Sequence, residues 1–241
     1  MKHPVLRGPV GEEVSEIDTH ERGKAGASAM AEHDRRAKKR EDRVMARAPR
    51  IGKLLLAIYD DPQSTKAWEV GAEGEIAIGR YLDSLAEKYE FLVLHDRLIP
   101  KSRANIDHIA ITKSGIFVID AKNYQGTIQI RDQSGFFSAP NPKLWVGKRN
   151  CMKLIDGMKH QVEVVKAVLS DHHIEMPVVG VLAFYLADWG TYKFMRKQEV
   201  IDGVLINSKG IEPIVSKLGT HLPEELKMVS RLLAGALKVA S

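Results

Sequence analysis

The stretch NIDHIAITKSGIFVIDAKN, residues 105–123, decides the fold. Residues 105–112 and 115–123 predict two strands joined by a turn at 113–115, and this is the strongest hairpin signal in the chain. The second strand is apolar at every position of 116–119, so we expect it to be central in its sheet and covered on both faces. The hairpin is therefore the element around which the domain is expected to pack.

Two charged residues end this apolar strand. Asp120 and Lys122 follow the four apolar residues, and because side chains alternate along a strand they project from one face while Ala121 lies on the other. An unpaired charge at such a position costs on the order of several kcal/mol. Both residues therefore need partners, although a structural ion pair between them is an alternative to a catalytic role.

The register of the hairpin decides what Asp120 faces. If the chain turns about the Lys113–Ser114 bond, paired residues have numbers that sum to 227, and the Cβ atoms of Asp107 and Asp120 lie about 4.5–5.5 Å apart. Two carboxylates at that separation repel unless a cation or a proton lies between them, as in a Mg²⁺ site. A three-residue loop with a left-handed Gly115 would instead set Asp107 opposite Ala121, unless a bulge restores the pairing.

The rest of the chain predicts an α/β domain with a mixed central sheet flanked by helices. We expect a disordered tail at 1–31, a basic helical arm at 32–66, the main domain at 67–207, and C-terminal helices packed on the core at 208–241. The expected elements are a helix from 64 or 68 to 88, a strand at 91–94, an exposed hairpin at 127–131 and 135–138, a long helix at 150–171, strands at 177–186 and 204–206, and helices at 210–218 and 223–239.

Composition narrows the class of protein and its partners. A net charge of +5 and a pI near 9.2 favour polyanions such as nucleic acid. No stretch approaches the ~20 apolar residues of a membrane helix, so we expect no membrane partner. With no apolar run of signal-peptide length and a single cysteine, Cys151, the cytoplasm is the expected location. The oligomeric state is open, a homodimer being one alternative.

Basic residues gather in two places that could contact nucleic acid. The first lies before Pro49, and the second lies beside the exposed hairpin. The alternative for the first group is a solvated helix face, and exposed cations beside a hairpin are equally common. The candidate contacts are Arg35, Arg36, Lys38, Lys39, Arg40, Lys148 and Arg149.

A wider pattern accompanies the Asp-x₁₂-Asp-x-Lys spacing. The sequence GAEGE at 71–75 opens a helix, NIDH stands at 105–108, GIFVIDAKNYQG at 115–126, and a later helix carries Gln161. Together these resemble the nuclease-related domain (NERD) family of the PD-(D/E)xK nuclease superfamily, over roughly 68–185. The resemblance implies a restriction-endonuclease-like core. It departs from the superfamily motif at Ile106, where the name calls for proline.

The resemblance also implies roles for individual residues. Asp107 and Asp120 would be direct metal ligands, and Lys122 would be the electrophilic or water-positioning group. Glu75 would point its carboxylate toward the metal, and Gln161 would approach from the long helix. From the residues alone, Glu75 is equally a charge favoured by the helix dipole, and Gln161 is equally a polar residue at the rim.

These expectations converge on a hydrolase, a metal-dependent nuclease that cleaves phosphodiester bonds. DNA is the expected substrate, although the sequence does not decide between DNA and RNA. Mg²⁺ or Mn²⁺ would be held by Asp107, Asp120 and the Ala121 carbonyl, with Glu75 binding a second ion or orienting the water. Endonuclease action is expected, while polarity and strand preference are not decided by the sequence. The alternatives are a non-catalytic nucleic-acid-binding module that retains the fold, and a structural interaction domain.

Overall fold

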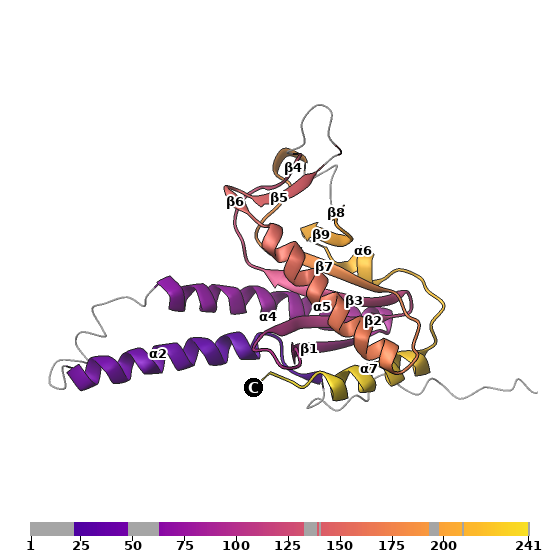
Figure 1. Ribbon diagram of the computed structural model, residues 1–241, viewed down its shortest axis with the longest axis horizontal. Helices are drawn as coiled ribbons and strands as arrows, with labels where there is room; N and C mark the ends of the chain where they lie inside the picture. Colours follow the sequence, from indigo (N-terminus) through magenta and orange to yellow (C-terminus); the bar gives the residue numbers. More distant parts are fainter. Residues whose placement is uncertain are drawn as a thin grey trace, which may run out of the picture.

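The computed structural model describes residues 22–47, 63–132, 139, 141–192, 198–208 and 210–240, with backbone alone for 63–70 and 192. These residues form a mixed six-stranded sheet with helices on both faces, and a smaller three-stranded sheet stands beside it (Figure 1). The predicted α/β class is confirmed. None of the helices within the described ranges combines the length and apolar character that a bilayer span requires.

The central sheet has the strand order β1-β2-β3-β7-β9-β8. β2 is antiparallel to both β1 and β3, whereas β3, β7 and β9 are parallel, and β8 is antiparallel to β9. β3 is buried along all but its last residue, as its apolar sequence predicts. The strands are β1 (Leu92–Leu98), β2 (Asn105–Thr112), β3 (Gly115–Lys122), β7 (Val178–Phe184), β8 (Gln198–Ile201) and β9 (Val204–Ser208).

The hairpin of β2 and β3 has the register in which paired numbers sum to 227. His108 pairs with Ile119 and Thr112 with Gly115, so the shifted alternative is wrong. Gly115 has φ of +135°, and a Cβ there would lie 2.7 Å from the Pro177 carbonyl oxygen. Because only glycine fits this position, the turn stays tight and the register is fixed.

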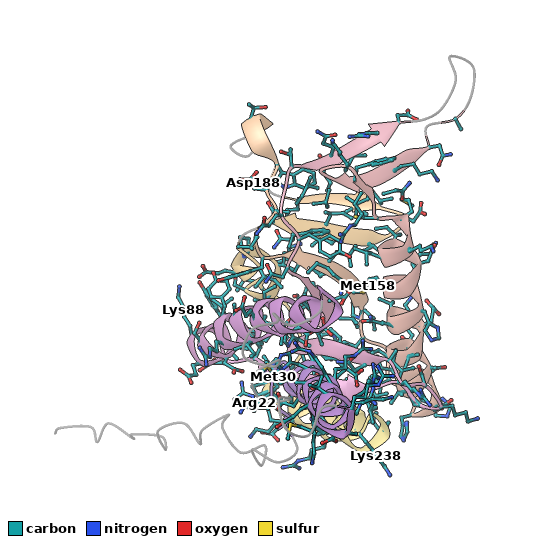
Figure 2. The ribbon with its side chains drawn as sticks, turned by 90° about the vertical axis from the view of Figure 1, so that its left-hand side faces the viewer. Arg22, Met30, Lys88, Met158, Asp188 and Lys238 are labelled. Carbon is teal, nitrogen blue, oxygen red and sulfur yellow. The ribbon has the colours of Figure 1, made fainter. Side chains whose placement is uncertain are left out.

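Two helical layers enclose the sheet, with α4 on one side and α5 on the other (Figure 2). The side chains of α4 (Gln63–Tyr89) and of the short α6 (Glu212–Val215) pack on one apolar cluster that includes Phe117 and Ile119. The side chains of α5 (Met152–Asp171) and α7 (Pro223–Ala236) pack on a second cluster that includes Val118. The alternating side chains of β3 thus enter both cores, as a central strand should.

Helix α2 (Ala27–Arg47) lies along α4, and the two helices extend together beyond the sheet (Figure 1). The start of α2 is anchored to β1, because the Ser28 N–H and Oγ donate to the two carboxylate oxygens of Asp96 at 2.6 and 2.7 Å. The predicted tail at 1–31 is therefore wrong for 22–31, while 1–21 lie outside the described residues. Of the predicted arm, 48–62 also lie outside them.

The second sheet corrects the predicted exposed hairpin. β4 (Ile128–Asp132) pairs with β5 (Pro142–Val146), which continues to β6 (Arg149–Asn150). We expected Pro142 to follow a strand at 135–138, but it begins the strand that pairs with β4, a position where its missing N–H is tolerated. Residues 133–138 lie outside the described part of the chain.

Other element boundaries differ in three places. β1 continues four residues beyond the predicted end at Leu94, because its polar residues find buried partners that are distant in sequence. β8 was not predicted, and the predicted helix at 210–218 is limited to α6, with a 3₁₀ turn at Gly190–Tyr192 before β8. The long helix, the strands β7 and β9, and α7 fall where they were expected.

Candidate active site

Two buried carboxylates lie side by side where β2 and β3 diverge. Asp107 is 7% exposed and Asp120 is 6% exposed. The ladder between the strands ends at His108 and Ile119, and one step further the Ala121 N–H donates to Oδ2 of Asp107 at 2.9 Å. The carboxylate of β2 is thereby fixed against the backbone of β3, between the two charged residues that end this strand.

The Lys122 ammonium is the cation nearest to these acids. Its Nζ forms an ion pair with Asp120 and donates to the Ala121 carbonyl at 3.3 Å. Burial lowers the pKa of Lys122, but the carboxylates of Asp120, Asp107 and Glu75 together raise it above its usual value. Lys122 therefore stays protonated, which suits it to stabilise negative charge rather than to accept a proton.

Glu75 reaches the same cluster from α4. Burial raises the pKa of Glu75 to about 7, aided by repulsion from Asp96 and Asp120 and opposed by Lys122. Burial also raises the pKa of Asp107 well above its ordinary range, followed by repulsion from Asp120 and Glu75. Three acids therefore share one low-dielectric region with a single ammonium group among the interacting residues, and this excess of negative charge favours a further cation.

Glu75 and Gln161 each carry a buried oxygen that lacks a partner. Oε2 of Glu75 and Oε1 of Gln161 have no hydrogen-bond partner within the described residues. Gln161 lies on α5, on the face of the sheet toward which Asp120 and Lys122 project. Because unpartnered buried oxygens are costly, each is a ready acceptor for a ligand or an ordered water.

The donor set suits a hard divalent cation. Carboxylate and carbonyl oxygens are the ligands that Mg²⁺ and Mn²⁺ prefer, and the orphaned Glu75 oxygen is available to such an ion. Across the described ranges, no three His, Cys, Asp or Glu side chains are already gathered around one metal position. In this arrangement the Lys122 ammonium is the cation that pairs with Asp120, so the fit rests on donor chemistry and charge.

Two buried histidines, His95 and His108, form a pair close to Asp107. The sequence did not predict this pairing. Nδ1 of His95 and Nδ1 of His108 are 2.9 Å apart, and Nε2 of His95 is 3.0 Å from the carboxylate of Asp83 on α4. Arg22 donates to the same carboxylate at 2.6 Å. The sequence does contain an indication of it, because the polar residues His95, Asp96 and Arg97 directly follow an apolar strand. Such a run indicates buried polar groups that need partners.

This network connects β2 and β1 to α4 through Asp83. Because a carboxylate only accepts, Nε2 of His95 carries the proton toward Asp83. Burial lowers the pKa of His108 well below its usual value, with a further contribution from His95, while the Glu75 backbone carbonyl opposes the shift. A Cβ on Gly79 would lie 3.2 Å from Cε1 of His108, so this glycine admits the imidazole against α4.

A basic cleft opens next to the end of β3. It has a volume of about 510 Å³ and is lined by residues that follow Lys122 and by the turn between β5 and β6. The Arg149 guanidinium lies 4.3 Å from the centre of the Tyr124 ring, and Lys148 lines the same cleft. The structure thus brings two of the predicted nucleic-acid contacts, Lys148 and Arg149, beside the acidic cluster.

The predicted contacts on α2 separate into two groups. Arg35 and Arg36 both donate to Glu32, at 2.7 and 2.5 Å, so these cations are engaged within the helix. Lys38 and Lys39 are exposed further along α2, and Arg40 is partly buried. Within the described part of α2, Lys38 and Lys39 therefore present their ammonium groups to solvent.

Comparison with known proteins identifies the family of the region that contains the acidic cluster. Searches among curated proteins and among solved structures found no match. A family model described as the nuclease-related domain matches residues 70–185, which include Glu75, both aspartates, Lys122 and Gln161. This part of the chain belongs to the nuclease-related domain family.

Proposed function

We propose that the protein is a metal-dependent nuclease that hydrolyses phosphodiester bonds in DNA. The observation that carries the proposal is the cluster of the buried Asp107 and Asp120 and the half-buried Glu75 around the Lys122 ammonium, at the diverging end of β2 and β3. Charged groups in a low-dielectric site are costly for stability, so such a cluster is more typical of chemistry than of packing. The family assignment points to the same class of reaction.

Asp107, Asp120 and the Ala121 carbonyl would hold Mg²⁺ or Mn²⁺, with Glu75 as a further acid ligand. The bound ion would polarise the phosphate and lower the pKa of the attacking water. Lys122, held protonated by its acidic neighbours, would stabilise the negative charge that develops on the phosphate oxygens. The bond from the Ala121 N–H would hold the Asp107 carboxylate in place, and Gln161 would supply an acceptor from α5.

The surroundings of the cluster suit a polyanionic strand. The cleft with Lys148 and Arg149 begins at the residue after Lys122, and Tyr124 and Trp145 each lie under a guanidinium group. Cations position phosphates, and aromatic rings stack on exposed bases. A strand that passes through this cleft would bring its backbone to the acidic cluster.

The experiment is a cleavage assay with linear, circular and single-stranded DNA and with single-stranded RNA. We expect cleavage of DNA with Mg²⁺ or Mn²⁺, binding without turnover in Ca²⁺, and no cleavage in EDTA. Asp171→Asn, an exposed substitution on α5, is the control variant and should cleave like the wild type. EDTA-resistant cleavage would contradict metal dependence, and binding without cleavage under any divalent ion would leave a nucleic-acid-binding module as the function.

A further inference from the structure

A second cavity lies on the α4 side of the sheet, and nothing described so far uses it. Its volume is about 390 Å³, within the range of small-molecule pockets, which is about 300–1,000 Å³. Most of its wall is apolar, and none of the described residues that line it is charged. The residues that matter for its chemistry are Ile78 and Tyr81 on α4, Tyr185 and Leu186 after β7, and Asn207 on β9.

Exposed apolar side chains gather at the mouth of this cavity. Tyr81, Tyr185 and Leu186 are 39%, 43% and 45% exposed, and all three line the same pocket. The Tyr81 hydroxyl is tied to Glu212 at 3.5 Å, which leaves its ring at the rim. Large apolar residues grouped around a cavity mark a ligand-binding surface, whereas single ones are common.

A buried polar atom stands in the wall of the cavity. Asn207 is 3% exposed, and its Oδ1 has no hydrogen-bond partner within the described ranges. A buried acceptor without a partner costs free energy unless a ligand supplies a donor. The cavity therefore combines flat aromatic and apolar walls with one acceptor that needs an N–H group.

The cavity adjoins the acidic cluster through two elements. The Tyr185 N–H donates to the carbonyl of Lys122 at 3.0 Å, so Tyr185, the residue after β7, lies beside the end of β3. Ile78 lies one turn beyond Glu75 on α4, and residues three apart are neighbours on a helix. The cavity and the acidic cluster are thus linked through the end of β3 and through one turn of α4.

We propose that this cavity binds an unstacked nucleobase of the strand that is cleaved at the acidic cluster, an inference that rests on the proposed nuclease function. The base would stack on the tyrosine rings and donate an N–H to Oδ1 of Asn207. A base suits the lining better than a phosphate, because the described lining residues are mostly apolar and the Glu212 carboxylate lies beside Tyr81. A second copy of the chain does not fit, because three exposed side chains offer far less than the ~800 Å² per partner of a stable interface.

An unstacked base implies a substrate class. Within an intact duplex the bases are paired and stacked, so occupation of the cavity requires single-stranded, frayed or flipped DNA. The protein should therefore bind single-stranded DNA more tightly than a blunt duplex of the same length.

The test is a base-removal scan on a short single-stranded DNA oligonucleotide, with binding to the full-length protein measured in EDTA. Each nucleotide in turn is replaced by an abasic residue. We expect one position at which base removal weakens binding about ten-fold, the effect of losing one stacked base. In Tyr185→Ala and in Asn207→Leu that position should lose its influence, while Tyr185→Phe, which keeps the ring, should retain it.

Matched controls separate this proposal from the general function. Met228→Ala removes a side chain of similar exposure on α7, on the other face of the sheet, and should leave the scan unchanged. Thermal unfolding should show every variant folded, since Tyr185 is exposed and Asn207→Leu removes an unsatisfied buried oxygen. Two results would overturn the cavity assignment but leave the nuclease proposal unaffected. In the first, base removal changes the affinity equally little at every position. In the second, one position remains sensitive to base removal in both Tyr185→Ala and Asn207→Leu. Absence of DNA binding would overturn both the cavity assignment and the nuclease proposal. If the protein self-associates and Tyr185→Ala abolishes this, a second copy of the chain is the occupant, and the assignment of a nucleobase is overturned.

Discussion

The Oδ2 atom of Asp107 accepts a hydrogen bond of 2.9 Å from the backbone N–H of Ala121. This bond crosses from β2 to β3 at the residue between Asp120 and Lys122, so the position of one acid is set by the backbone that carries the other two groups. It also supplies one favourable contact to a carboxylate that burial and two neighbouring acids disfavour.

Substitutions of Asp107 should separate this hydrogen bond from the charge. Asp107→Asn keeps an acceptor for the Ala121 N–H and removes the charge that Asp120 and Glu75 repel, whereas Asp107→Ala removes both. We expect both variants to lose cleavage by about 10²-fold or more, and the asparagine variant to unfold at the higher temperature. Thermal unfolding and single-turnover cleavage measure the two effects. Equal unfolding temperatures would show that the bond contributes nothing to the fold.

Glu75 should destabilise the metal-free protein at alkaline pH. Its folded pKa of about 7 lies above the ordinary glutamate pKa of 4.5, so the favourable protonated form is lost as the pH rises through 7. Glu75→Gln should therefore stabilise the protein at pH 8, on the order of 1–3 kcal/mol, and much less at pH 5. Urea unfolding in EDTA at the two pH values is the measurement.

The control for this prediction is Glu73→Gln on the same helix, where the side chain is exposed. It should change the free energy of unfolding little at either pH. A gain from Glu75→Gln that is the same at pH 5 and pH 8 would contradict the assignment of a raised pKa to Glu75.

His108 should contribute the opposite pH dependence. Its pKa is lowered by burial, so the folded protein keeps it neutral while the unfolded chain takes up a proton below about pH 6.5. The stability that His108 contributes is thus present at pH 7.5 and lost as the pH falls. In His108→Asn, the free energy of unfolding should decline less between pH 7.5 and pH 5.5 than in the wild type, whereas the exposed His160→Asn should follow the wild type. Parallel curves for His108→Asn and wild type would refute the prediction.

The exposed cations of α2 should raise DNA affinity without taking part in the chemistry. Deletion of the segment would also remove the contact of Ser28 with Asp96, so charge removal is the cleaner change. Lys38→Gln, Lys39→Gln and Arg43→Gln together should reduce the slope of log K against log salt by about 0.9 for each duplex phosphate contact that is lost. The rate at saturating substrate should change little.

The matched control removes three lysines elsewhere, at Lys217, Lys227 and Lys238, and so changes the net charge equally. Binding is measured at several salt concentrations, with Asp120→Ala in every protein to prevent cleavage. Equal slopes for the two triple variants would assign the α2 cations to a solvated helix face.

The sequence predicted those parts of the site whose determinants are local. The turn at Gly115 and the apolar run of β3 fix the register, which places Asp107 beside Asp120. Glu75 entered the prediction only through the family resemblance. The expectation that 71–75 opens a helix is wrong, because α4 begins at Gln63 and Glu75 lies in its interior. A lone glutamate in a helix carries no sign of what that helix will face.

The missed features depend on contacts between distant segments. β1 continues through Asp96 because Ser28 donates to that carboxylate from a helix 68 residues away in sequence. Likewise, the base-sized cavity is formed by α4, β7 and β9, and neither Tyr185 nor Asn207 belongs to a recognisable motif. Hydrophobic periodicity predicts which residues are buried, but it does not predict which polar partners meet there.

The measurement that tests the central claim most directly is single-turnover DNA cleavage by Asp120→Ala and Lys122→Ala, at saturating Mg²⁺ and after extensive purification. The account predicts that each variant loses at least about 10²-fold in rate, as expected for the loss of a metal ligand or of an electrostatic stabiliser, while its thermal unfolding remains cooperative. Undiminished metal-dependent cleavage by both folded variants would contradict the account, because the reaction would then take place without the acid and the ammonium at the end of β3.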